Sequence, residues 1–162
     1  MFPALRLFVV DQRGAAAAEM ALILPLLLAL LFTGLEGAHY LYAEHQVVKG
    51  VRDGARYAGR LPFTSFTCGS LVNSSDITAV QNVTRTGLPT GGNARVRGWV
   101  NTHVTVGASC TALDTGIYQD MTNAPRVEVS ATVPYISLFG MLTGFDVDVS
   151  LHAAQQAAVM GI

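Results

Sequence analysis

Hydrophobic and polar residues divide this chain into an apolar N-terminal stretch and a more polar remainder. No charged residue occurs between Met20 and Leu35, where Leu, Ile and Phe dominate. A membrane-spanning helix needs about 20 such residues, so the run is long enough only if it also takes in Ala15 and Glu19. A carboxylate is costly at mid-membrane and tolerable near an interface. We therefore expect a membrane span over residues 15–36, with Glu19 at the headgroup level or just inside it.

The helical pattern continues beyond this run. No proline occurs between Pro25 and Pro62, and we expect one helix from about Ala15 to Gly59, roughly 65 Å long, with a kink at Pro25. Residues 37–60 would be its part outside the membrane, although its glycines cost about 1 kcal/mol each relative to alanine. Three- and four-residue spacings, or their multiples, predict one apolar face made of Leu35, Ala38, Tyr42, Val51, Ala55 and Ala58. The polar side is expected to carry Glu36, Glu44, Lys49, Arg52, Asp53 and Arg56.

Residues 61–162 are richer in Thr, Ser, Asn, Gly and Val and are expected to form a separate α+β domain. The stretch SSDITAVQNVTRTG predicts a short helix that is capped by Ser75 or Asp76 and ends near Gly87. The following LPTGGNAR is typical of a loop. Its Gly-Gly is not a phosphate-binding loop, because no Lys-Ser or Lys-Thr follows it.

Three later stretches alternate between apolar and polar residues: 100–106, 126–133 and 145–151. This period of two predicts a small antiparallel three-stranded sheet with one solvent-facing side. The emerging helix and the second short helix are the expected covers of its other side. The apolar connection PYISLFGMLTG, residues 134–144, either folds back onto the core or contacts a partner or membrane surface.

Charge before the apolar run predicts how the chain is oriented. Arg6 and Arg13 precede the run, which favours a cytoplasmic N-terminus and an exported C-terminal part. Cys68 and Cys110 would then lie in an oxidising compartment, where we expect them to form a disulfide. The alternative is a pair of buried free thiols.

A family resemblance accounts for the carboxylate in the run. Gly14, four small residues, Glu19 and a hydrophobic stretch resemble the type IV prepilin cleavage motif. The longer segment RGAAAAEMALILPLLLALLFTGLEGAHYLYAEHQVVKGVRDGARYA resembles TadE-like pseudopilins of tight-adherence (Flp, type IVc) pilus systems. Met20 departs from the Phe or Tyr that is common after the glutamate. The resemblance covers about 45 residues, and the remainder agrees with the family only in its general layout.

The resemblance implies a role for each residue of the motif. A prepilin peptidase would remove residues 1–14 by cutting after Gly14, and Ala15 would become the first residue of a chain anchored in the bacterial inner membrane. The new amine has a reference pKa of about 8 and can neutralise Glu19 of its own chain or of a neighbour, which would set the register between subunits. The implied fold is pilin-like, and the implied partners are other pseudopilins, the major pilin and the inner-membrane assembly platform of an adhesive pilus.

Two other interpretations of the N-terminus remain open. One is a secretory signal cut near Gly37-Ala38, although no clean A-x-A occurs there. The other is an unprocessed single-pass anchor that carries an extracytoplasmic ligand-binding domain, in which Glu19 is an interfacial acid without a partner.

Candidate chemistry in the rest of the chain is sparse. Glu36 and His39 form one E-x-x-H, but a di-iron bundle needs two such motifs and further glutamates. Asp146 and Asp148 fit a solvated strand face better than an acid–base pair. A net charge of -1 gives no electrostatic case for a nucleic-acid partner. We therefore predict a structural protein without a cofactor or metal, not an enzyme.

Overall fold

The computed structural model describes residues 14–113, 115–119, 121–144 and 148–162. Arg6 and Arg13, on which the predicted orientation depends, lie outside these residues. The chain divides into two units, and the second runs from His39 to Ile162. The helices are α2 (Ala15–Ala58), α3 (Ser74–Thr86) and α4 (Leu138–Thr143), and the strands are β1 (Phe66–Thr67), β2 (Ser70–Leu71), β3 (Val104–Thr111), β4 (Ala124–Pro134) and β5 (Ser150–Ala158). The predicted α+β class, with a long apolar N-terminal helix, a three-stranded antiparallel sheet and a second helix, is confirmed.

Helix α2 forms where the sequence predicts it. It is continuous from Ala15 to Ala58 and contains Pro25, while the kink expected at that proline stays a prediction. The predicted apolar face is right only towards the C-terminal end, where Val51 and Ala55 are buried. Tyr42 is 61% exposed, and Leu35 and Ala38 are exposed as well. The residues that are buried further along include Ala43, Val47, Gly50 and Gly54.

Small residues on α2 let helix α3 approach closely. A Cβ atom added at Gly50 would collide with the backbone oxygen of Thr84 and come within 2.7 Å of the Trp99 ring. A Cβ atom added at Gly54 would collide with the Thr84 hydroxyl. Thr84 is fully buried, and its hydroxyl donates to the Val80 carbonyl oxygen at 2.8 Å. These glycines therefore form a packing surface, whereas the sequence pattern indicates only their unfavourable helix propensity.

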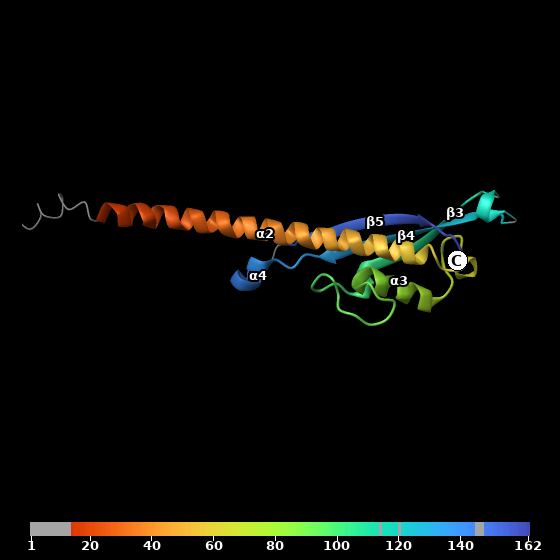
Figure 1. Ribbon diagram of the computed structural model, residues 1–162. Helices are drawn as coiled ribbons and strands as arrows, with labels where there is room; N and C mark the ends of the chain where they lie inside the picture. The colour runs from red at the N-terminus through yellow and green to blue at the C-terminus, as the bar shows by residue number, and fades with distance from the viewer. Residues whose placement is uncertain (1–13, 114, 120, 145–147) are drawn as a thin grey trace, which may run out of the picture. The chain divides into compact units, whose positions relative to one another are not determined.

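The three-stranded sheet has the order β3-β4-β5, with both pairs antiparallel. Alternation in the central strand β4 follows the prediction, since Val127, Val129 and Val133 are buried and Glu128 is exposed. The buried side chains of β4 share one core cluster with Val47 and residues from α3 and the loops. Figure 1 shows α3 and the sheet alongside the second half of α2, as expected of the two covering helices.

The two outer strands lie further along the chain than predicted. Residues Asn101–His103 form a 3-10 turn, so β3 begins only at Val104. Strand β5 begins at Ser150, so the predicted strand 145–151 is wrong at Asp148 and Val149, while residues 145–147 lie outside the described ones. Strand β5 continues to Ala158 through nine register pairs with β4, from Pro134↔Ser150 to Arg126↔Ala158.

Helix α3 differs from its prediction only at its N-terminal end, where it begins two or three residues earlier. Its N-cap is Asn73 instead of the expected Ser75 or Asp76, and the Asn73 amide donates to an Asp76 carboxylate oxygen at 3.3 Å. Gly87 ends the helix with φ of 87°, a left-handed conformation that glycine adopts without strain. The loop predicted after it is present.

The apolar connection after β4 folds back onto the core at its start, as the first of its two predicted roles requires, while the predicted partner or membrane contact stays a prediction. Tyr135 is buried in the core cluster, and Ser137 caps α4 by accepting a hydrogen bond from the Gly140 amide at 2.8 Å. Leu138, the first residue of α4, is 47% exposed. The connection therefore folds back at its start and presents apolar surface at Leu138.

Candidate functional site

The residues of the predicted cleavage motif lie at the beginning of α2. Gly14 is exposed, and among the described residues no atom beyond its chain neighbours lies within 4 Å of the position that its Cβ would occupy. Ala15 is the first residue of the helix, and Glu19 follows it by four positions, which places both on one side of the helix. Glu19 is exposed, and within the described part of the chain it makes no hydrogen bond or ion pair. Within the described part of the chain, nothing therefore covers Gly14 or pairs with the Glu19 carboxylate.

The apolar run after Glu19 is exposed along its length. Helix α2 is the one helix among the described residues that is long and apolar enough to cross a membrane. Burying one large aliphatic side chain contributes about 1.5–3 kcal/mol, so this surface strongly favours an apolar environment such as a bilayer or a helical bundle. The large side chains exposed here are Met20, Leu22, Ile23, Leu24, Leu26, Leu27, Leu28, Leu30, Leu31, Phe32 and Leu35.

The two cysteines form the predicted disulfide. Cys68 and Cys110 are joined with their Cα atoms 5.3 Å apart and a sequence separation of 42. Cys68 lies between β1 and β2, and Cys110 lies in β3. The bond therefore ties the short β1–β2 hairpin, which the sequence analysis did not predict, to the edge of the main sheet.

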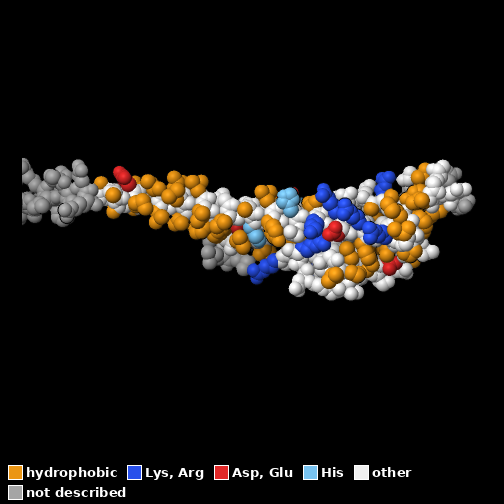
Figure 2. Space-filling view, in the orientation of Figure 1, with side chains coloured by type: hydrophobic (Ala, Val, Ile, Leu, Met, Phe, Trp, Pro, Cys, Tyr) orange, Lys and Arg blue, Asp and Glu red, His pale blue; other side chains and the backbone are white. Residues whose placement is uncertain are grey.

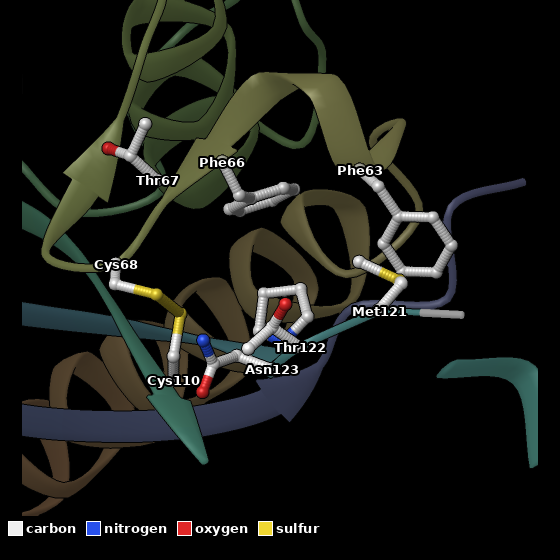
Figure 3. Close-up of a pocket in the computed structure, with 9 residues that line it drawn as sticks. Phe63, Phe66, Thr67, Cys68, Cys110, Met121, Thr122 and Asn123 are labelled. Carbon is white, nitrogen blue, oxygen red and sulfur yellow. A yellow bond between two sulfur atoms is a disulfide. The ribbon is translucent and has the colours of Figure 1, made fainter. Parts of the chain in front are cut away.

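Beside this bond lies a small cleft (Figure 3) of about 250 Å³. Its walls include Phe63, Phe66 and Met121 together with the disulfide. Among the described lining residues, none carries a titratable group, so they supply no acid, base or nucleophile. The volume lies just below the 300–1,000 Å³ that is typical of small-molecule sites. No local sequence signal marks this cleft, because it forms from three segments that are distant in the chain.

The remaining candidate residues are His39 and the two aspartates, Asp146 and Asp148. The His39 Nδ1 atom lies 2.9 Å from the Tyr135 hydroxyl, with which it shares a hydrogen bond. Asp148 is exposed, whereas Asp146 lies outside the described residues. In the ranges that the structure describes, no group of three or more His, Cys, Asp or Glu residues could hold a metal ion.

Comparison with known proteins identifies a family that the N-terminal part of the chain matches. Residues 14–56 match the family described as TadE-like protein. The matched segment starts at Gly14 and ends two residues before α2 does, so it covers the predicted motif and almost all of the helix. The resemblance is thereby confirmed over this segment, and it associates the chain with Tad pili and with a family of structural pilus components. No curated protein and no solved structure matches the chain.

Proposed function

We propose that this chain is a pseudopilin, or minor pilin, of a Tad (type IVc) pilus and is cut by a prepilin peptidase between Gly14 and Ala15. One coincidence carries the proposal: the family match begins at Gly14, helix α2 begins at Ala15, and an exposed carboxylate, Glu19, follows one helical turn later. Cutting there removes residues 1–14 and leaves the whole of α2 as an anchor.

Cleavage changes the electrostatics at the start of α2. It creates an α-amine on Ala15, one helical turn from Glu19 on the same side of the helix. A carboxylate that enters an apolar bundle without a cation is strongly unfavourable. The amine of the same or a neighbouring subunit removes this penalty, so Glu19 favours only those helix registers that bring an amine next to it.

The apolar run supplies the attraction between subunits. In the precursor it lies in the bacterial inner membrane, with the N-terminus in the cytoplasm and the disulfide-bonded domain outside. During assembly the exposed side chains between Met20 and Leu35 move from lipid into a bundle formed with other pseudopilins and the major pilin. Because lipid and bundle are similarly apolar, close packing and the Glu19–amine pair determine which arrangement is favoured. The assembled pilus would serve surface adhesion, with this subunit in its tip or priming complex.

The decisive experiment is to determine the intact mass and first residue of the protein from membranes with and without an active prepilin peptidase. We expect a chain that starts at Ala15 only when the peptidase is active. A chain that starts at Met1 in both membranes would instead support the unprocessed anchor with a ligand-binding domain. A start near Ala38 would identify a secreted domain and contradict the proposal.

Two matched pairs of variants separate cleavage from assembly. Gly14→Ala should leave the precursor uncut, whereas Gly34→Ala should be cut normally. Both glycines have open space at their Cβ positions, so neither substitution should disturb the fold and the two variants differ only in whether the cleavage site is changed. Glu19→Gln should be cut but should fall at least tenfold in the assembled fraction, while Glu44→Gln should assemble normally. Normal assembly of the Glu19→Gln chain would refute the role given to this carboxylate.

A further inference from the structure

The second half of α2 presents a row of cations on its outer side. Lys49, Arg52, Arg56 and Arg60 are all exposed, and they follow one another at steps of three or four residues. Such steps place side chains along one side of a helix, and Arg60 extends the line just past the end of α2. Figure 2 shows Lys and Arg side chains following one another over this part of the molecule. We name these four residues the cationic row.

The cationic row has no anionic partner within the described part of the chain. None of its four side chains makes a hydrogen bond or an ion pair there. The acid next to it in sequence, Asp53, is already paired, because a carboxylate oxygen accepts a hydrogen bond from Arg95 Nη2 at 2.7 Å. Like charges at three- and four-residue spacing repel one another and destabilise an isolated helix. The row therefore gains from an acidic surface that is not its own.

The core of the second unit cannot supply that surface. Val47, Val51 and Gly54 face the core, and at 100° per residue the cationic row lies on the opposite side of the helix. Two copies packed through this side would bring like charges together. The nearest other acid on this half of α2, Glu44, precedes Lys49 by five positions, a spacing that does not place it over the row. Asp76 lies on α3, and Glu128 lies on β4, where it accepts a hydrogen bond from Gln156 at 2.9 Å.

We propose that the cationic row binds an acidic helix face on a different subunit of the same pilus. This inference rests on the proposed function and adds the chemistry of one partner. Four charges in a single line match the ridge of a second helix, on which acids at three- and four-residue spacing would lie opposite them. Because the row repels its own copy, it also selects against neighbours of the same kind.

Two other polyanionic partners fit the row less well. Single-stranded nucleic acid is bound by cations combined with aromatic side chains, and the row contains no aromatic residue. Lipid headgroups attract cations that lie within about one Debye length, roughly 8 Å at physiological salt. Lys49, however, follows Leu35, the last residue of the apolar run, by 14 positions, or roughly 20 Å along a helix.

The test uses a photo-crosslinking amino acid placed at His45, which is exposed and lies four positions before Lys49. Full-length protein is crosslinked in cells that assemble pili, and mass spectrometry identifies the crosslinked peptide. The neutral variant carries Lys49→Gln, Arg52→Gln, Arg56→Gln and Arg60→Gln. Its matched control, with Arg52→Lys, Arg56→Lys and Arg60→Lys, keeps every charge. Emission from Trp99, the single tryptophan, reports whether each variant folds.

We expect an adduct with an acidic helical peptide of another pilus subunit. Its yield should fall at least tenfold in the neutral variant, because several exposed ion pairs are lost together, and should persist in the charge-keeping control. An adduct with a second copy, a lipid or a nucleic acid would overturn the inference, as would a yield that the neutral variant leaves unchanged. Intact mass from the same samples distinguishes failure of this inference from failure of the proposed function. A chain that starts at Ala15 with an unchanged crosslinking yield refutes only the binding role of the cationic row. An uncut chain refutes the proposed function.

Discussion

The two halves of helix α2 follow the same backbone geometry with opposite surface chemistry. Between Met20 and Leu35 the large side chains are exposed, and no part of this apolar run is buried within the described part of the chain. Between Ala43 and Ala58 the buried residues are small or β-branched, and they pack against a folded domain. The first half is built for a partner outside the chain, whereas the second half has its partner within it.

Glycines make the contrast specific. Gly34 and Gly37 have nothing within 4 Å of the position that a Cβ atom would occupy, while Gly50 and Gly54 are in close contact with α3. One residue type is thus a neutral spacer in one half of the helix and a packing requirement in the other. Its role follows from what approaches it, which intrinsic helix propensity does not describe.

Loss of the disulfide should have the largest effect on stability, and this effect should be confined to the domain that packs on the second half of α2. Replacing both Cys68 and Cys110 by alanine should lower the free energy of unfolding of the exported domain by about 4 kcal/mol, because the bond closes a long loop in the unfolded chain. Urea titration of the full chain in detergent micelles, followed by Trp99 emission, measures this loss. The helical circular dichroism of the first half should persist after Trp99 is exposed, since micelles cover its apolar surface. A loss below about 1 kcal/mol would contradict the expectation.

The glycine contrast gives the next largest effect. Gly54→Ala should destabilise the domain by about 2 kcal/mol, since the new methyl group collides with the buried Thr84 and overpacking costs about 1–3 kcal/mol. Gly34→Ala is the matched control and should cause no loss, because alanine is the better helix former and has open space there. Equal effects of the two substitutions on thermal unfolding would show that α2 and α3 do not pack as described.

The smallest effect concerns the ion pair between α2 and the loop that follows α3. Asp53→Asn should lower the free energy of unfolding by about 1 kcal/mol, because the Asp53 and Arg95 side chains are 32% and 16% exposed and water screens their attraction. The difference should shrink in about 1 M salt. Glu44→Gln, on the same half of the helix, controls for the loss of a charge. A loss that is independent of salt would assign the effect to packing instead of charge.

Local patterns predicted the parts of this fold that depend on near neighbours. The span of α2, the end of α3 at Gly87 and the alternation of β4 all follow from residues within a few positions of one another. The cleavage motif, from Gly14 to Glu19, is likewise a local pattern, and this explains why it is recognisable from the sequence. The disulfide could be predicted because the chain contains only two cysteines.

Strand β5 shows where local patterns fail. Its sequence SLHAAQQAA is rich in Ala and Gln, which favour helices, and its alternation is weak. It is extended because it pairs with β4 along its whole length, where Ala131 lies opposite Ala153 and Val133 opposite Leu151. Hydrogen bonding to an adjacent strand outweighs an intrinsic preference of a few tenths of a kcal/mol per residue.

By itself, the sequence determined the long helix, the membrane-length apolar run, the motif around Gly14 and Glu19, and the central strand, because each is encoded by spacing along one segment. Tertiary structure alone decided which face of α2 is buried, where β3 and β5 begin, and that a cleft forms beside the Cys68–Cys110 bond. These features depend on contacts between segments that are distant in the chain. Their free energies come from packing and strand pairing, which no single window of sequence contains.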